Sequence, residues 1–422
     1  MRLLPCLVLA ACTNETGTIQ LELTSAPGST VLDGVQRLRV TLTDPPVVVE
    51  APRVDGGFDL LIDVEATGTA GVLIVEGLDD GDSLVATGAS PPFAVSGINA
   101  RVVVYVAAPL TIGAAPVALP AERIGVASTP LSYGFAVAGG ETSEGTRTDS
   151  IFIYNSFDHT LVAGIAMPAP RSFQTLVTGS NNGIYLFGGL GSDGAPTGSL
   201  WRFDTTVQPS GAFSIGTESS TLAREGAPAI SLLPEHFVIS GTPPVNLDFG
   251  VPTARTDVPV LDAGVGLVVD DRGIGVFAGD PVTRLADDVF ETYPVSTVAD
   301  ATAAIVGTSA VFTTATTDLL LLDVSATSSG STIDALSVIR HRPAIAATAS
   351  HVVIAGGTDD GGQPIATADI LDAITLARIT TVPCVARAGA SAYALPNGQI
   401  AIVGGEPANA AIELFTPPPP NP

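Results

Sequence analysis

The sequence predicts an all-β protein with a β-sandwich-like domain at residues 17–108 and a larger, repetitive domain at residues 117–416. Short apolar runs alternate with polar residues, 45 Gly and 33 Pro punctuate them, and one strand pattern recurs along the second part of the chain. A length of 422 residues suffices for two cores. Hydrophobic content of 46% against 14% charged residues is typical of packed proteins.

The charge balance excludes several classes of function. The net charge is -25, and all 17 basic residues are Arg, because the chain contains no Lys. A Schiff-base lysine and a P-loop lysine are therefore both excluded, and no nucleotide partner is expected. Because such an acidic surface repels phosphate backbones, no nucleic-acid partner is expected either. We interpret the acidity as a contribution to solubility, with Ca²⁺ binding as the alternative.

The first twelve residues have the outline of a signal peptide. Arg2 supplies one positive charge, and a short apolar stretch then ends in small residues. The end of this stretch, Leu9-Ala10-Ala11-Cys12, resembles the lipobox of bacterial lipoproteins. The resemblance implies that residues 1–12 are the lipoprotein signal, that Cys12 is the lipid attachment site, and that the membrane is a partner through this lipid. An ordinary signal sequence or a buried strand with a chance cysteine is the alternative.

The residues after Cys12 bear on the compartment. Thr13 and Asn14 follow, and the absence of an aspartate at the second position implies, by the same resemblance, sorting to the outer membrane of the bacterial cell envelope. Cys6 and Cys12 belong to the leader, so Cys384 alone remains and no disulfide is expected. We interpret Cys384 as a small buried apolar residue and not as a nucleophile.

The first domain shows the alternation of half-buried strands. The expected strands total about seven, which favours a β-sandwich (Ig-like) domain. They include residues 19–23, 38–42, 58–64, 72–76 and 101–106. Asp79, Asp80 and Asp82 surround Gly81, and we interpret this group as a polar turn between two strands in preference to a cation loop.

The second domain begins after a small-residue linker at residues 109–116 and is built from repeats. Apolar strands end in a glycine pair, or its remnant, at steps of 49, 53, 38, 77 and 48 residues. The 77-residue gap is expected to contain a worn unit, that is, a repeat that has lost its glycines, at residues 311–323. These glycine sites are Gly139-Gly140, Gly188-Gly189, Gly241, Gly279, Gly356-Gly357 and Gly404-Gly405.

Arginines precede these glycines at regular distances. Arg123, Arg171, Arg224 and Arg387 stand 16 or 17 residues before their glycines, and Arg342 stands 14 before Gly356. We expect them to tie a loop or an adjacent repeat by hydrogen bonds, in preference to binding a phosphate or carboxylate.

The strand-Gly-Gly-strand repeat of about 50 residues resembles the kelch motif of β-propellers. The resemblance covers residues 117–416 and implies seven blades, with six as the alternative because the third to fifth units have lost glycines. The last unit ends after two strands, and a Pro-rich tail follows at residues 417–422. Residues 117–123 resemble residues 165–171, so we expect this N-terminal piece to close the ring.

No catalytic residue, cofactor site or metal-ligand set can be assigned. The four histidines form no HExxH or HxH arrangement, and no GxSxG elbow occurs. Proteins that contain kelch-like propellers include sugar oxidases, sugar epimerases and pure binding platforms, so the fold alone does not decide whether the chain is an enzyme. The leading hypothesis is an envelope-anchored lipoprotein that binds a protein or glycan through propeller loops. The alternatives are a carbohydrate-active enzyme with axial carboxylates and a structural or adhesive envelope component.

Overall fold

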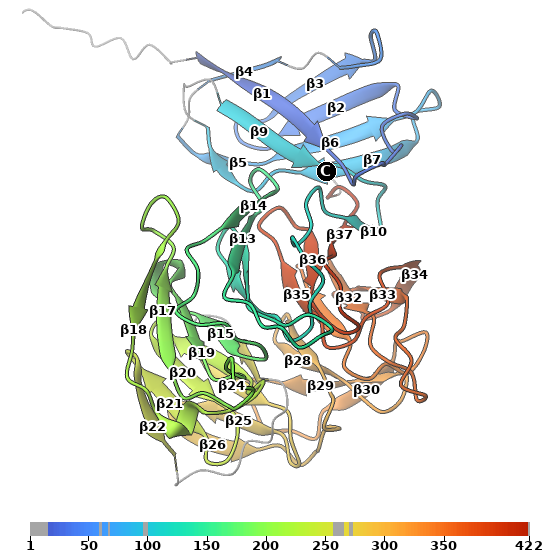
Figure 1. Ribbon diagram of the computed structural model, residues 1–422. Helices are drawn as coiled ribbons and strands as arrows, with labels where there is room; N and C mark the ends of the chain where they lie inside the picture. The colour runs from blue at the N-terminus through green and yellow to red at the C-terminus, as the bar shows by residue number, and fades with distance from the viewer. Residues whose placement is uncertain are drawn as a thin grey trace, which may run out of the picture.

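The structure is a computed structural model that describes residues 16–58, 61–65, 68–95, 100–255, 266–269 and 273–420. It is all-β, as predicted, and its sheets form an N-terminal unit (residues 16–107) and a repeat region (residues 111–416) (Figure 1). Two short 3-10 helices are the helices of the described residues, η1 (Ser180–Asn182) and η2 (Ser220–Leu222). No described helix has the length and hydropathy needed to cross a membrane.

The N-terminal unit contains two main sheets that share one core. Buried side chains of both sheets meet in it, among them Ile19 and Val104 from one sheet and Leu38, Val40 and Val75 from the other. The three-stranded sheet is β4 (Leu61–Glu65), β1 (Thr16–Thr24) and β9 (Ala100–Tyr105), the four-stranded sheet is β3 (Val47–Pro52), β2 (Arg37–Leu42), β6 (Leu73–Leu78) and β7 (Leu84–Ala89), and β5 (Ala70–Gly71) pairs with β8 (Phe93–Ala94).

The repeat region contains seven four-stranded antiparallel sheets among the described residues, which agrees with seven units and not with six. The first three are β11 (Ala127–Leu131), β12 (Gly134–Ala138), β13 (Ile151–Asn155) and β14 (Thr160–Ala163); β15 (Thr175–Thr178), β16 (Ile184–Phe187), β17 (Leu200–Asp204) and β18 (Ala212–Ile215); and β19 (Ala229–Leu233), β20 (His236–Ile239), β21 (Val245–Asp248) and β22 (Val251–Ala254).

The fourth to sixth sheets continue the same order, and the fifth contains the predicted worn unit in its second and third strands. They are β23 (Gly266–Val269), β24 (Ile274–Phe277), β25 (Thr283–Ala286) and β26 (Val289–Thr292); β27 (Ala303–Val306), β28 (Ser309–Thr313), β29 (Asp318–Asp323) and β30 (Ser331–Asp334); and β31 (Ala344–Ala347), β32 (His351–Ala355), β33 (Thr367–Asp372) and β34 (Arg378–Pro383).

The seventh sheet joins the two ends of the repeat region. Its inner strands are β35 (Ser391–Ala394), β36 (Ile400–Val403) and β37 (Ile412–Thr416), and its outer strand is β10 (Thr111–Ala114). The expectation that residues 117–123 supply the closing strand was therefore wrong in position. The strand comes from the segment predicted to be a linker, whose small residues fit beside β37, while Leu119 and Arg123 donate backbone hydrogen bonds to Ala410 and Asn409.

The first strands of the seven sheets form a continuous row. Each contacts the first strand of the next sheet, from β11 through β15, β19, β23, β27 and β31 to β35. Ser128 Oγ on β11, the first strand of this row, and the Tyr393 hydroxyl on β35, the last strand, lie 2.8 Å apart. Burial is greatest in the middle of the sheets: the second strands β16 and β32 are buried throughout, whereas the fourth strand β14 is largely exposed and β18 is half exposed.

A joint between consecutive repeats explains the glycine pairs. The N–H of the second glycine donates to the backbone carbonyl of the next repeat's arginine, from Gly140 to Arg171 over 2.9 Å and from Gly357 to Arg387 over 2.7 Å. Both residues of a pair have a positive φ. At Gly356 a Cβ would stand 2.2 Å from the Arg387 carbonyl oxygen, so a side chain has no room.

The arginine side chains tie the loops of their own repeat. Arg387 donates to the carbonyls of Gly404 and Ala411, both over 3.1 Å, and to Glu413 over 2.7 Å. Arg171 donates to Ser199 and stacks on Trp201, its guanidinium carbon 3.8 Å from the ring centroid. The structural role predicted for the arginines is confirmed by these contacts.

In the sixth repeat the tying arginine is Arg340, 16 residues before Gly356, and the choice of Arg342 was wrong. Arg340 donates to the Gly356 carbonyl over 2.8 Å and pairs with Asp369 at 3.1 Å, and both side chains are fully buried. Arg342 is half exposed and lies 3.7 Å from Glu406. The two arginines stand two residues apart, so spacing alone did not separate them.

The variants Arg340→Met and Arg342→Met should differ in their free energy of unfolding. Removing Arg340 leaves the Asp369 carboxylate buried without its cation, so we expect a loss of about 3–5 kcal/mol of stability. Removing Arg342 breaks a surface pair, for which about 1 kcal/mol or less is expected. Urea unfolding followed by tryptophan fluorescence measures both, and equal losses would contradict the assignment.

Candidate binding site at the first-strand row

A cavity of about 540 Å³ lies among the first strands. Six of the seven sheets contribute to its lining through β11, β15, β19, β27, β31 and β35 or the residues just before them. Its polar side chains are hydroxyls, and apolar side chains such as Leu176, Ile230 and Ile345 stand between them. The hydroxyls belong to Ser128, Thr129, Thr178, Ser231, Thr302, Ser391 and Tyr393. The described lining is thus uncharged and can offer both hydrogen bonds and apolar contact.

The backbone just before the first strands forms a chain of hydrogen bonds from repeat to repeat. Phe173 N–H donates to Gly125 and Gly226 N–H to Phe173, both over 2.7 Å; likewise Arg342 N–H donates to Asp300 over 3.3 Å and Gly389 N–H to Arg342 over 2.8 Å. In each repeat with a tying arginine, this residue follows the arginine by two positions and has a φ between 52° and 66°.

The left-handed backbone accounts for the glycines at this position. Phe173 and Arg342 adopt it with a side chain present, which is uncommon and is often found where function requires it. Pro343 and Ala390, which follow Arg342 and Gly389, line the cavity. The hydrogen-bonded residues therefore stand at its rim.

A charged cluster lies beside this rim and links repeats five and six. His341 Nδ1 is 2.6 Å from a carboxylate oxygen of Asp300, and Nε2 is 3.0 Å from one of Asp360. Carboxylates only accept hydrogen bonds, so both contacts together require a doubly protonated imidazole. The hydrogen bonds from the imidazole to Asp360 and Asp300 raise the pKa of His341 above its ordinary 6.5.

The other histidines have different surroundings. His159 is buried, its Nδ1 lies 2.7 Å from the Tyr154 hydroxyl, and burial lowers its pKa to about 4. His236 Nδ1 lies 2.9 Å from Asp248. Burial also lowers the pKa of His351, whose Nδ1 contacts Ser350. The four histidines belong to four separate places in the structure.

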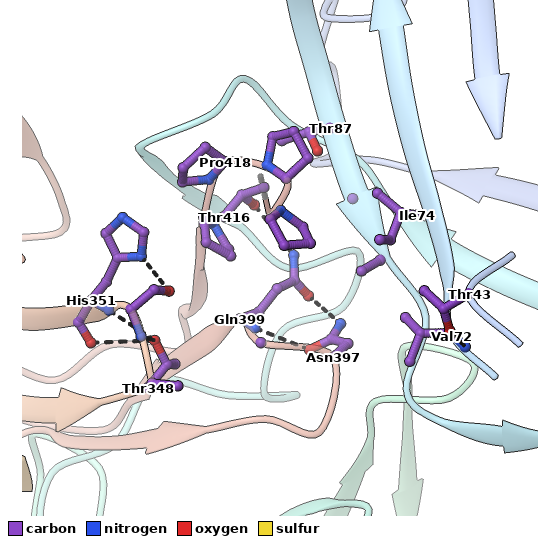
Figure 2. Close-up of a pocket in the computed structure, with 18 residues that line it drawn as sticks. Thr43, Val72, Ile74, Thr87, Thr348, His351, Asn397, Gln399, Thr416 and Pro418 are labelled. Carbon is purple, nitrogen blue, oxygen red and sulfur yellow. Dashed lines mark hydrogen bonds between the residues drawn. The ribbon is translucent and has the colours of Figure 1, made fainter. Parts of the chain in front are cut away.

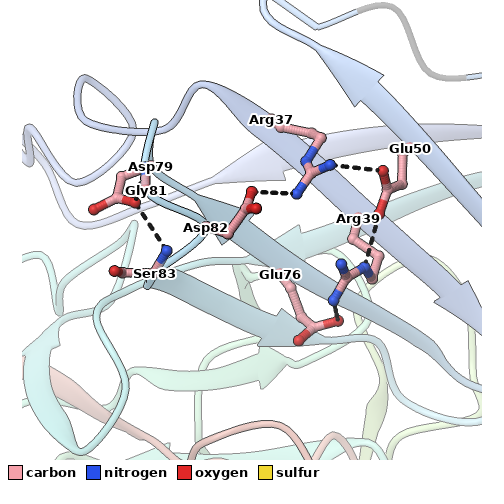
Figure 3. A network of polar contacts seen from close by, with 8 residues as sticks. All are labelled: Arg37, Arg39, Glu50, Glu76, Asp79, Gly81, Asp82 and Ser83. Carbon is pink, nitrogen blue, oxygen red and sulfur yellow. Dashed lines mark hydrogen bonds and ion pairs between the residues drawn. The ribbon is translucent and has the colours of Figure 1, made fainter.

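The acidic turn of the N-terminal unit is a structural turn, as predicted. The Asp79 carboxylate accepts from the N–H groups of Gly81 and Ser83, both over 2.8 Å, and Asp82 pairs with Arg37 (Figure 3). Arg37 and Arg39 share Glu50, and Arg39 also faces Glu76 at 3.8 Å. Within the described part of the chain, no group of three or more His, Cys, Asp or Glu side chains could hold a metal ion.

Two further residues singled out in the sequence are the cysteines Cys12 and Cys384. Cys12 lies outside the described residues. Cys384 is half-buried against the core between the sixth and seventh sheets, and burial raises the pKa of its thiol to about 11, as expected for an inert apolar thiol. In the loop at residues 358–363, Asp359 accepts two backbone N–H groups, while Asp360 turns to His341.

Comparison with family models and with curated proteins finds no match for this chain. Sequence reasoning did not find the rim or the His341 cluster, because Asp300, His341 and Asp360 come together only through the contact between repeats. The glycines two residues after Arg123, Arg224 and Arg387 were the one available signal.

Folding should shift the pKa values of His341 and His159 in opposite directions. His341 gains its carboxylate partners on folding, so we expect its pKa to lie above 6.5 in the native protein. The stabilisation that this residue provides is lost as pH rises through its native pKa. His159 should stay neutral down to about pH 4, and its contribution is lost as pH falls from 6.5 towards 4. NMR titration of histidine-labelled protein measures both, with His341→Gln and His159→Gln assigning the signals; a His159 value near 6.5 would contradict its burial.

Proposed function

We propose that this chain is an exported lipoprotein, anchored to the bacterial cell envelope through Cys12, that binds a protein or glycan partner. In this proposal the N-terminal unit is a β-sandwich that acts as a spacer, and the repeat region is a seven-bladed kelch-like β-propeller. Seven successive four-stranded sheets, the contacts between consecutive first strands and the hydrogen bond between Ser128 and Tyr393 support the propeller. The lipobox resemblance at residues 9–12 supports the anchor, and outer-membrane sorting is part of the same proposal.

The observation that carries the binding function is the uncharged cavity of about 540 Å³ at the first-strand row. Its volume lies within the range of small-ligand sites. Hydroxyl groups from several different sheets converge on one space, which suits an uncharged polar ligand such as a glycan or a peptide loop. The charged groups next to the rim are paired with each other, His341 with Asp300 and Asp360, and Arg342 with Glu406.

The His341 cluster supports a second candidate, a carbohydrate-active enzyme. An imidazole held between two carboxylates beside a cavity is able to move a proton, and general acid–base catalysis needs such a group within reach of a bound substrate. Turnover of a glycan that is lost in Asp300→Asn and His341→Gln, with binding retained, would favour this candidate. Self-association without a soluble ligand would instead favour the structural or adhesive role.

The anchor is tested by Cys12→Ser with Cys6→Ser as its matched control. We expect Cys12→Ser to abolish incorporation of labelled palmitate in a bacterial host and to release the protein from the membrane fraction, because the thiol that carries the lipid is gone. Cys6→Ser should keep both properties. Labelling that survives Cys12→Ser would contradict the anchor and leave the binding proposal untouched.

The cavity is tested by Ser391→Tyr, which places a ring in the lining, with Ser214→Tyr on the exposed strand β18 as the control. The probe is an array of envelope glycans and peptides exposed to the purified protein. We expect Ser391→Tyr to lose at least about tenfold in affinity, since about 1.4 kcal/mol of lost contact suffices for that change. Equal binding by the two variants would contradict a ligand in this cavity.

A further inference from the structure

A second cavity, of about 560 Å³, lies between the N-terminal unit and the repeat region (Figure 2). The N-terminal unit contributes Val72, Ile74 and residues 87–89 to its lining. The repeat region contributes two turns, residues 348–351 and residues 397–399. Thr43 and Thr416 also line it, and a further wall is the proline segment, Pro417–Pro420, which follows β37. In Figure 2, Pro418 lies between Thr87 on one side and His351 on the other.

The chemistry of proline explains why the chain leaves the sheet here. The last ladder bond of β37 runs from Leu110 N–H to the Thr416 carbonyl over 2.9 Å. The next four residues have no N–H to donate and a fixed φ, so they cannot continue the pairing and favour an extended, polyproline-type course. Such a segment presents its pyrrolidine rings to the neighbouring surface, and three of the four prolines are half-buried.

The walls that the proline segment passes are complementary to it. Val72, Ile74 and Ala349 give apolar surface for pyrrolidine rings. Behind them a buried polar frame holds the turn in place: Asn397 donates to Gln399 over 2.7 Å, and Gln399 donates to the Thr416 hydroxyl over 3.2 Å. This frame satisfies its own hydrogen bonds and leaves the wall preformed, which lowers the cost of holding a rigid ligand.

We propose that the cleft between the N-terminal unit and the repeat region is a binding groove for a polyproline segment, in which Pro417–Pro420 is held in cis and forms one wall of the remaining cavity. The segment then acts as a strap, because it lines the same cavity as the N-terminal unit and the turns of the sixth and seventh sheets. This inference is independent of the proposed ligand at the first-strand row. A small apolar molecule in the groove is the competing outcome of the test.

The experiment separates the segment from its groove. A chain ending at Thr416 keeps every strand, and a fluorescein-labelled peptide with the sequence of residues 416–422 is the probe. We expect the peptide to bind the shortened chain at least about tenfold more tightly than the full chain, in which the tethered segment competes at high effective concentration. A peptide with Pro417–Pro420 replaced by alanine should bind neither chain with comparable affinity.

Wall variants show where the peptide binds. In the shortened chain, Ile74→Asn should weaken peptide binding, and Val48→Asn, on the exposed edge strand of the same sheet, should not. Equal peptide affinity of the shortened and full chains would overturn the proposal. So would the absence of peptide binding, or binding of a neutral hydrophobic dye that the peptide does not displace.

A measurement on the full chain keeps the proposal testable if the shortened chain fails to fold. Ile74→Asn should raise the amide hydrogen exchange of the turns at residues 348–351 and 397–399, because the strap loosens on both walls. Val48→Asn should leave their exchange unchanged. Unchanged exchange in Ile74→Asn would overturn the strap.

Discussion

The repeat region depends on one joint, formed where a glycine pair meets the arginine of the next repeat. At this point the backbone carbonyl of the arginine accepts from the second glycine, while its side chain reaches the glycine site of its own repeat. One residue thus fixes two successive sheets by its main chain and by its side chain. Arg387 and Arg340 are nearly fully buried, so their positions are specified by hydrogen bonds that water does not replace.

The joint is different between the seventh and the first sheets of the repeat region. Arg123 exchanges backbone hydrogen bonds with Asn409 and not with the second glycine of the last pair, and Asn409 also donates to the Gly404 carbonyl. The core at this place combines side chains of the first and last sheets with Tyr105 from the N-terminal unit. The Tyr105 hydroxyl donates to the Ala114 carbonyl over 3.0 Å. The N-terminal unit is therefore packed on the closing sheet and does not stand apart from it.

The sequence allowed the strand content, the six glycine sites and the structural role of the arginines to be predicted, because each has a local pattern. It did not identify Arg340, since Arg342 fits nearly the same spacing, or β10, whose small residues resemble a linker. The His341 cluster depends on contacts between repeats that no periodicity encodes, and the rim left only the glycines two residues after Arg123, Arg224 and Arg387 as a signal. The interdomain groove depends on how the N-terminal unit packs, which sequence patterns in either part do not determine.

The pairing of β10 with β37 has a consequence for folding during synthesis. The two strands lie roughly 300 residues apart in the chain, so the seventh sheet cannot be completed until the ribosome has made the whole repeat region. Until then β11 and each newly made sheet lack the next sheet that will pack on them, and their apolar faces are open to other chains. The emergence of β37, the last strand of the repeat region, therefore ends the period in which these faces are open to other chains.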